Sequence, residues 1–278
     1  MGAGNCPLIS MDDIKERIDA SWVEEGEQRA YLGASMIGHE CEAYLAMGLR
    51  GYPKKPFPPH VLRIFQLGHV IEDLVVAHLK KAGYHVQEKN EFTGRQFEWK
   101  DLGGHVKAHA DGMIDLGTGV MSLLEIKSMN DKKHKEFVRK GIKIANRTYY
   151  EQMQMMMGMD GRLKDALFIA YNKNDSTYAC EVVEYDPLDY AYIVDKVNRI
   201  VAGRSVKLRA VEGKFPCTWC DRATLCWSDE QDSEIPTLCR TCNWSKPTDD
   251  GAWKCAKYNK RCEDPCDDWV RIQLEPAL

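Results

Sequence analysis

The sequence lacks any long apolar run. No segment approaches the roughly 18 consecutive apolar residues that a membrane-spanning helix requires. The start, MGAGNCPLISMDDIKERIDA, has neither the basic block nor the apolar block of a secretory signal peptide. We therefore expect a soluble, cytoplasmic protein with no membrane partner.

Neither sign of charge is in large excess, and no internal repeat or nucleotide-binding glycine motif is visible. The chain has 38 Lys and Arg against 42 Asp and Glu, a formal net charge of −4. This balance argues against a protein that coats nucleic acid over its whole surface, but it allows a basic patch beside an acidic site. With 278 residues and 44% hydrophobic content, the chain is long enough for one large domain plus an appendage.

The chain does contain alternating strand and helix patterns. Apolar spacing predicts a helix over residues 61–81, with Glu72 on its apolar stripe, and a second helix over 147–159. Strands are predicted at 84–92, 105–116, 120–127, 166–172 and 178–185, followed by a helix after Pro187. This order of elements indicates an α/β fold.

The stretch LLEIKSMN, residues 123–130, places a carboxylate and an ammonium inside an apolar strand. Because side chains at i and i+2 share one face of a strand, Glu125 and Lys127 lie together, opposite Leu124 and Ile126. Glu72 and Asp111 add two acids on neighbouring predicted elements. Three converging carboxylates repel one another unless a divalent cation neutralises them, and their hard oxygen ligands favour Mg²⁺ or Mn²⁺.

These residues resemble the PD-(D/E)XK nucleases, in the RecB-like and lambda-exonuclease-like branch. GHVIED, HADGMID, LLEIKSM and YYEQMQMMM follow the order of the family's motifs over residues 35–227. The resemblance implies a restriction-endonuclease-like core, with a mixed central sheet flanked by helices. It also implies a set of catalytic residues: Glu72, Asp111, Glu125, Lys127 and Gln152. The family's proline is Ala110 here, and Asp115 competes with Asp111 for the second acid.

The resemblance implies that Glu72, Asp111, Glu125 and the carbonyl of Ile126 hold the Mg²⁺ or Mn²⁺ ion. DNA would then contact Tyr149 and a basic stretch that contains Lys132, Lys133 and Lys135. Without DNA, such a stretch is an ordinary solvated helix face. His69 and His109 flank the acids, and we interpret them as neighbours of the site or surface residues.

The chain holds eleven cysteines, and in a reducing compartment clustered cysteines usually bind metal. FPCTWCDRATLCW gives Cys217, Cys220 and Cys226, and Cys41 can supply a fourth ligand. The arrangement is similar to the iron-sulfur staple of the AddB nuclease domain and of CRISPR-associated adaptation nucleases. It implies a 4Fe-4S cluster, although four thiolates suit zinc equally well.

After an acidic linker, a second group of cysteines resembles a small zinc ribbon. Its expected Zn²⁺ ligands are Cys239, Cys242, Cys255 and Cys266, with Cys262 as the alternative to Cys266. Cys6 and Cys180 are expected to be ordinary thiols. The predicted domains are an N-terminal helical segment (1–34), a nuclease domain with its iron-sulfur staple (35–228), and a linker with a cysteine-rich module (229–278).

The sequence therefore predicts a Mg²⁺- or Mn²⁺-dependent deoxyribonuclease. Among DNA nucleases, an exonuclease acting at DNA ends or single strands is favoured over an endonuclease. Its setting would be recombination, repair or phage DNA processing, in a bacterium or a phage-infected cell, with a recombination or replication protein as partner. The rival hypothesis is a non-catalytic nucleic-acid-binding protein with structural metal clusters. The sequence leaves the oligomeric state and the direction of degradation undetermined.

Overall fold

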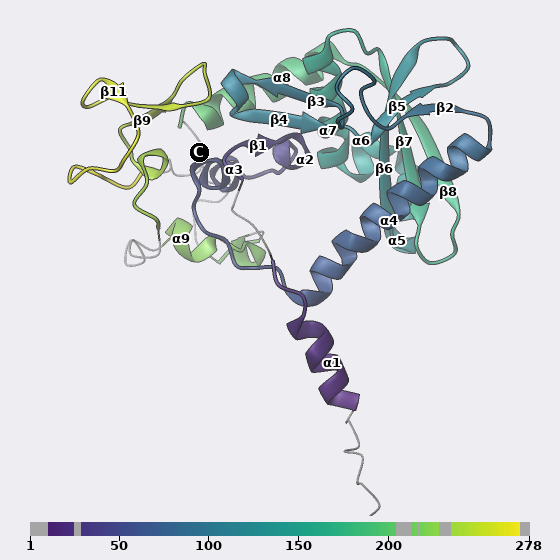
Figure 1. The fold of residues 1–278 in the computed structure, drawn as a ribbon, viewed down its shortest axis with the longest axis horizontal. Coiled ribbons are helices and arrows are strands. Elements are labelled where there is room, and N and C mark those ends of the chain that lie inside the picture. The colour runs from purple at the N-terminus through teal and green to yellow at the C-terminus, as the bar shows by residue number, and fades with distance from the viewer. Residues whose placement is uncertain (1–10, 25–28, 204–212, 216, 228–234, 273–278) are drawn as a thin grey trace, which may run out of the picture.

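The computed structural model describes residues 11–24, 29–203, 213–215, 217–227 and 235–272. Its central sheet has five strands in the order β2-β5-β6-β7-β8, of which only the β6–β7 pair is parallel. The bounds of these strands are β2 (His85–Gln87), β5 (Gly112–Asp115), β6 (Met121–Met129), β7 (Asp165–Asn172) and β8 (Tyr178–Glu184). A mixed sheet flanked by helices confirms the predicted α/β class (Figure 1).

Two smaller sheets accompany the central one. The first joins β1 (Leu32–Gly33), β4 (Val106–His109) and β3 (Glu98–Asp101) in the order β1-β4-β3, with the short helix η1 (Leu102–Gly104) between β3 and β4. The second is an antiparallel C-terminal sheet of β9 (Ser245–Pro247), β10 (Trp253–Cys255) and β11 (Lys260–Arg261). The second sheet forms the predicted small cysteine-rich module. The predicted domain limits at residues 34 and 228 stay predictions.

Helices pack on both faces of the central sheet, while α1 extends away from it (Figure 1). Their bounds are α1 (Met11–Ala20), α2 (Ala34–Ile37), α3 (Glu42–Arg50), α4 (Pro59–Lys81), α5 (Asp131–Lys140), α6 (Ile142–Ala145), α7 (Arg147–Asp160), α8 (Pro187–Val201), η2 (Cys217–Trp219), α9 (Ala223–Trp227) and η4 (Cys239–Thr241). Helices α5, α6 and α7 form the crossover between the parallel strands β6 and β7. None of the described helices is long and apolar enough to cross a membrane.

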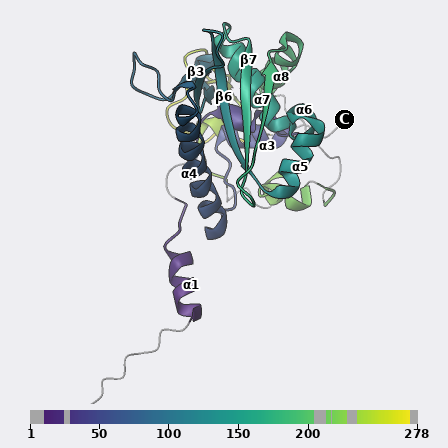
Figure 2. The ribbon, with the colours of Figure 1, turned by 90° about the vertical axis from the view of Figure 1, so that its right-hand side faces the viewer.

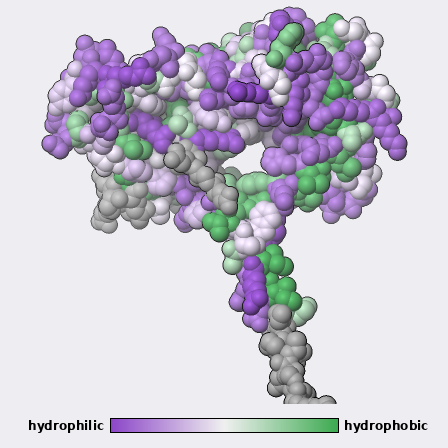
Figure 3. Space-filling view, viewed as in Figure 1, coloured by the Kyte–Doolittle hydropathy of each residue, from purple (hydrophilic) through white to green (hydrophobic). Residues whose placement is uncertain are grey.

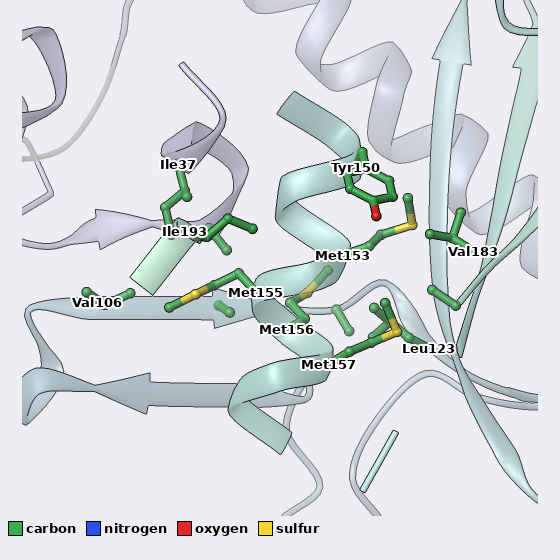
Figure 4. Packing of buried hydrophobic residues seen from close by; sticks show 14 of the residues in the cluster. Ile37, Val106, Leu123, Tyr150, Met153, Met155, Met156, Met157, Val183 and Ile193 are labelled. Carbon is green, nitrogen blue, oxygen red and sulfur yellow. The ribbon is translucent and has the colours of Figure 1, made fainter. Parts of the chain in front are cut away.

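Helix α7 is at the centre of the larger hydrophobic core. Its methionines Met153, Met155, Met156 and Met157 are fully buried, and Figure 4 shows them among side chains from α2, β4, β6, β8 and α8. The flexible, polarisable methionine side chain fills irregular gaps between elements that approach at different angles. This packing fixes α7 over one face of the sheet.

Helix α4 covers the opposite face through its C-terminal half. Ile71, Val75 and Val76 pack against Ile114, Leu124 and Ile126 of the sheet. The N-terminal half extends beyond the sheet (Figures 1 and 2), and Phe65 is 46% exposed. The predicted helix is confirmed, but none of the described strands covers its first turns.

The C-terminal module is held to the core by Arg50, at the end of α3. The guanidinium is almost fully buried, and it donates to the carbonyls of Arg240 at 2.9 Å, Cys242 at 3.4 Å and Ser245 at 3.3 Å. It also lies 4.9 Å from the centre of the Trp253 ring. One buried cation therefore satisfies three carbonyls of a module that is too small to have much core of its own.

We expect Arg50→Met to lower the unfolding free energy by about 3 kcal/mol, because it removes a buried, charged donor that three carbonyls of the module share. The matched control is Arg162→Met, which removes an exposed guanidinium paired with Asp160 and should leave the unfolding free energy nearly unchanged. Urea unfolding followed by tryptophan fluorescence gives both values. Equal effects of the two substitutions would contradict the anchoring role of Arg50.

Candidate active site

The four charged side chains of the proposed catalytic set come from α4, from β6 and from the link between β4 and β5, which meet at one corner of the central sheet. Asp111 lies in the link between β4 and β5, where the chain passes from the smaller sheet into the central one. Glu125 and Lys127 lie on β6, and Glu72 is in the middle of α4. The pKa values of Glu72 and Glu125 are both perturbed by Asp111 and by Lys127, so the four charges lie close enough to interact.

The start of β5 creates the polar notch in which Asp111 is held. The β5–β6 pairing begins at Gly112 and Leu124, so no described strand pairs with β6 beyond Leu124 on that side. The Asp111 carboxylate takes the place of the missing strand and accepts the Ile126 backbone N–H at 2.7 Å. A carboxylate is thereby fixed beside the end of an otherwise apolar strand.

Glu125 is the most deeply buried acid of the site. Its side chain is 0% exposed, is ion-paired with Lys127, and accepts a hydrogen bond from the Gln152 amide at 2.8 Å. Burial raises its pKa to about 8 against the attraction of Lys127, and Asp111 adds to the rise. Its other oxygen, Oε2, is buried without a hydrogen-bond partner.

Lys127 is less enclosed, with 21% of its side chain exposed, and its Nζ lies 5.5 Å from the centre of the Tyr149 ring. Burial opposes its charge, but the pKa is raised overall because Glu125, Asp111 and Glu72 surround the ammonium. Lys127 is therefore a cation at neutral pH. The pair predicted from LLEIKSMN faces a shared site, not open solvent.

Glu72 borders the site from α4. Burial raises its pKa, and the nearby Asp111 raises it further, while His69 and Lys127 oppose the rise. The His69 Nδ1 lies 3.3 Å from Glu72 Oε2, on a largely exposed ring. His109 pairs instead with Glu98 at 3.0 Å.

The structure separates Asp115 from this group. Its carboxylate accepts the backbone N–H groups of Gly117, Thr118 and Gly119 at 2.8 to 3.0 Å, which makes it the cap of the turn between β5 and β6. Asp115 and Asp111 therefore have different environments, and the Asp111 carboxylate is the one beside Glu125.

The predicted DNA-contacting residues lie on two helices. Lys132, Lys133 and Lys135 are exposed on α5, and Lys135 pairs with Asp131 at 2.8 Å. Tyr149 is half-buried in the first turn of α7 and stacks on Phe168, the residue opposite Glu125 in β7. Tyr149 thus joins the acidic site, while the lysines form an outer surface.

The acids have the oxygen chemistry that suits a hard divalent cation, and Glu125 Oε2 is a buried oxygen without a partner. Yet no three His, Cys, Asp or Glu side chains in the described ranges are already arranged to hold a metal ion. The reason is local: Glu125 faces Lys127 and Gln152, while Asp111 faces the Ile126 N–H. The donor set fits a cation, but cation binding requires these side chains to turn.

The first cysteine group is brought together in part. Cys41, Cys217 and Cys220 line one cavity of about 600 Å³, although Cys41 precedes the other two by almost 180 residues in sequence. Cys226 packs against a small apolar cluster that includes Met47 and Leu225. The thiol chemistry fits a soft metal, and three of the four predicted ligands share a cavity.

All five cysteines of the C-terminal module line a second cavity, of about 380 Å³. The Cys239 thiol donates to the Asp264 carbonyl at 3.1 Å, and burial raises the pKa of Cys239 to about 12, with Cys262 adding to the rise. Cys262 therefore lies beside Cys239, as Cys266 does. Cys180 is an exposed residue of β8, and Cys6 lies outside the described residues.

Comparison with known proteins gives matches only among solved structures. No family model and no curated protein matches the chain. The alkaline exonuclease LHK-Exo from Laribacter hongkongensis is similar at a TM-score of 0.42 and 20% identity, covering 67% of this chain and 91% of that one. The complex of LHK-Exo with dAMP is similar at a TM-score of 0.45 and 22% identity, again covering 67% of this chain and 91% of that one. SSO0001 is similar at a TM-score of 0.43 and 14% identity, covering 77% of this chain and 94% of that one.

The burial of Glu125 predicts a pH-dependent stability. Because folding raises its pKa from 4.5 to about 8, the folded state favours the protonated carboxyl, and this contribution to stability is lost as the pH rises through that window. Without added divalent cation, we expect the unfolding free energy to fall between pH 4.5 and 8 more steeply than in Glu125→Gln. Exposed Glu136→Gln is the control. Parallel curves for the wild type and Glu125→Gln would show that the prediction is wrong.

Proposed function

We propose that the protein is a metal-dependent deoxyribonuclease that degrades DNA from its ends. The observation that supports this most strongly is the meeting of Glu72, Asp111 and Glu125 beside one charged lysine, Lys127. Three acids and an ammonium at the end of a strand are the groups that phosphodiester hydrolysis needs. The motifs that resemble the PD-(D/E)XK nucleases place the same residues in these roles.

In this proposal Glu72, Asp111, Glu125 and the Ile126 carbonyl hold Mg²⁺ or Mn²⁺. When bound, the cation polarises the phosphodiester and lowers the pKa of a water. Gln152 orients Glu125 through its amide, as it does in the hydrogen bond at 2.8 Å. Tyr149 lies beside Lys127 and would supply a ring on which a base can stack.

Lys127 has two roles in the proposal. In the metal-free protein its ammonium contacts the buried Glu125 carboxyl. With Glu125 as a ligand of the cation, the partly exposed Lys127 ammonium would be available to orient the attacking water or to offset the charge that develops on the phosphate.

The proposed substrate is DNA at its ends or as single strands, in recombination, repair or phage DNA processing. The exposed lysines of α5 would contact the phosphate backbone, and a recombination or replication protein is the proposed partner. The cysteine cavities are the proposed sites of a 4Fe-4S cluster, with zinc as the alternative, and of Zn²⁺ in the C-terminal module. Visible absorbance and metal analysis of anaerobically purified protein distinguish iron-sulfur from zinc.

End-dependent cleavage is tested with Mg²⁺ or Mn²⁺ and end-labelled linear DNA against closed circular DNA. We expect loss of the linear form only. Equal degradation of both forms would contradict the end-dependent proposal and favour an endonuclease. If protein with intact cysteine-bound metals degrades neither form, the non-catalytic DNA-binding hypothesis replaces the enzyme.

Replacing Glu125 and replacing Lys127 should reduce cleavage for different reasons. Glu125→Gln removes a cation ligand, so we expect cleavage to fall at least 100-fold, with partial recovery at high Mn²⁺. Lys127→Ala removes a competitor for Glu125 and a transition-state contact, so Mn²⁺ binding should persist while turnover is lost. Calorimetric Mn²⁺ titration and single-turnover cleavage separate the two. Wild-type cleavage rates in folded Lys127→Ala would reduce the pair to a structural ion pair.

A further inference from the structure

A second cavity, separate from the acidic site, combines aromatic and cationic side chains. It measures about 460 Å³ and lies where β1, α3 and the first turns of α4 meet. Figure 3 shows a hollow at this junction of α4 with the rest of the molecule. Its aromatic and cationic lining comes from residues far apart in sequence: Arg29, Tyr31, Tyr44, Lys54, Phe57, Phe65 and Arg222.

Arg222 is the buried cation of this cavity. It is 4% exposed, its guanidinium lies 4.6 Å from the centre of the Tyr44 ring, and its Nε is buried without a hydrogen-bond partner. Its nearest carboxylate is Asp221, at 3.9 Å. A charge held this deeply with an unused donor points to an anionic ligand.

Lys54 and the backbone of Phe57 form a second anion-binding point on the same cavity. The Glu24 carboxylate accepts Lys54 Nζ at 2.7 Å and the Phe57 N–H at 3.1 Å. The Lys54 ammonium also lies 3.6 Å from the centre of the Phe57 ring. Glu24 comes from the chain after α1, which runs past the chain before α4 here (Figure 1). A carboxylate of the protein itself therefore occupies a position suited to a phosphate.

We propose that this cavity binds a nucleotide of a single-stranded nucleic acid, with the base among the aromatic rings and the phosphate on Lys54. Glu24 competes with the phosphate for Lys54 and the Phe57 N–H. Aromatic rings interleaved with cations bind single strands through stacking and phosphate contacts. The inference rests on the proposed nuclease function, for which it supplies a second grip on the strand.

The position of the cavity fits such a grip. Phe65 lines the cavity, and Glu72 of the acidic site is seven residues further along the same helix. At a rise of about 1.5 Å per residue, the two positions are about 10 Å apart along the axis of α4. A strand held in the cavity therefore has only a short span to cross to the acids.

The test measures binding of a fluorescein-labelled oligothymidylate by the full-length protein, without added divalent cation so that no cleavage occurs. We expect Lys54→Gln to weaken binding about tenfold and to reduce the slope of log affinity against log salt by about 1. Phe65→Leu should weaken binding at least fivefold, because Phe65 lines the cavity with a 46% exposed side chain, whereas Phe65→Tyr keeps the ring and should bind normally. Glu24→Gln should tighten binding about threefold, because it removes the competing carboxylate.

Lys80→Gln is the matched control, since Lys80 is also paired with a glutamate, Glu88, but at the far end of α4. The inference is overturned if Lys54→Gln binds like Lys80→Gln, or if Glu24→Gln weakens binding as Lys54→Gln does. The second result would make the Glu24–Lys54 pair structural. The binding test is independent of cleavage. If the protein shows the expected binding pattern but cuts no DNA, the nucleotide-binding cavity is supported and the nuclease proposal is contradicted.

Discussion

The burial of the Glu125 carboxylate is the constraint on which the rest of the site depends. A fully buried carboxyl is costly to ionise unless it is paired and hydrogen-bonded, and its raised pKa reflects that cost. Here Lys127 supplies the opposite charge, and Gln152 of α7 supplies an amide donor. The methionine packing of α7 is therefore linked to the chemistry of β6, because it holds Gln152 against Glu125. The uncompensated oxygen Oε2 is the position where a cation has most to gain.

The limits of the neighbouring elements bring the other acids to this point. β5 begins only at Gly112, while β6 extends further, so the Asp111 carboxylate occupies the free edge of β6 beside Ile126. α4 packs on the sheet only from Ile71 onward, which leaves Glu72 at the border of the buried region. The first turns of α4 extend past the sheet, and there Phe65 lines the aromatic and cationic cavity. Helix α4 thus contributes to both the acidic site and the cavity.

Much of this arrangement could be predicted from the sequence, because it follows from local periodicity. The alternation in LLEIKSM placed Glu125 and Lys127 on one face, and apolar spacing predicted the helix that carries Gln152. Contacts made across long separations could not be predicted in this way. The hydrogen bond from Ile126 to Asp111, the turn capped by Asp115, and the approach of Arg222 to Tyr44 depend on how elements dock. The spacing of the cysteines likewise did not predict that Tyr44 and Phe57 line the same cavity as Cys41, Cys217 and Cys220.

The central claim is that the acids around Glu125 form a cation site from which Lys127 is displaced. The most direct measurement is a crystal structure grown with Mn²⁺, with anomalous scattering recorded at the manganese edge. The account predicts one anomalous peak bounded by Glu125, Asp111 and Glu72, with the Lys127 ammonium moved away from Glu125. A map without a peak there, with Lys127 still paired to Glu125 at saturating Mn²⁺, would contradict it.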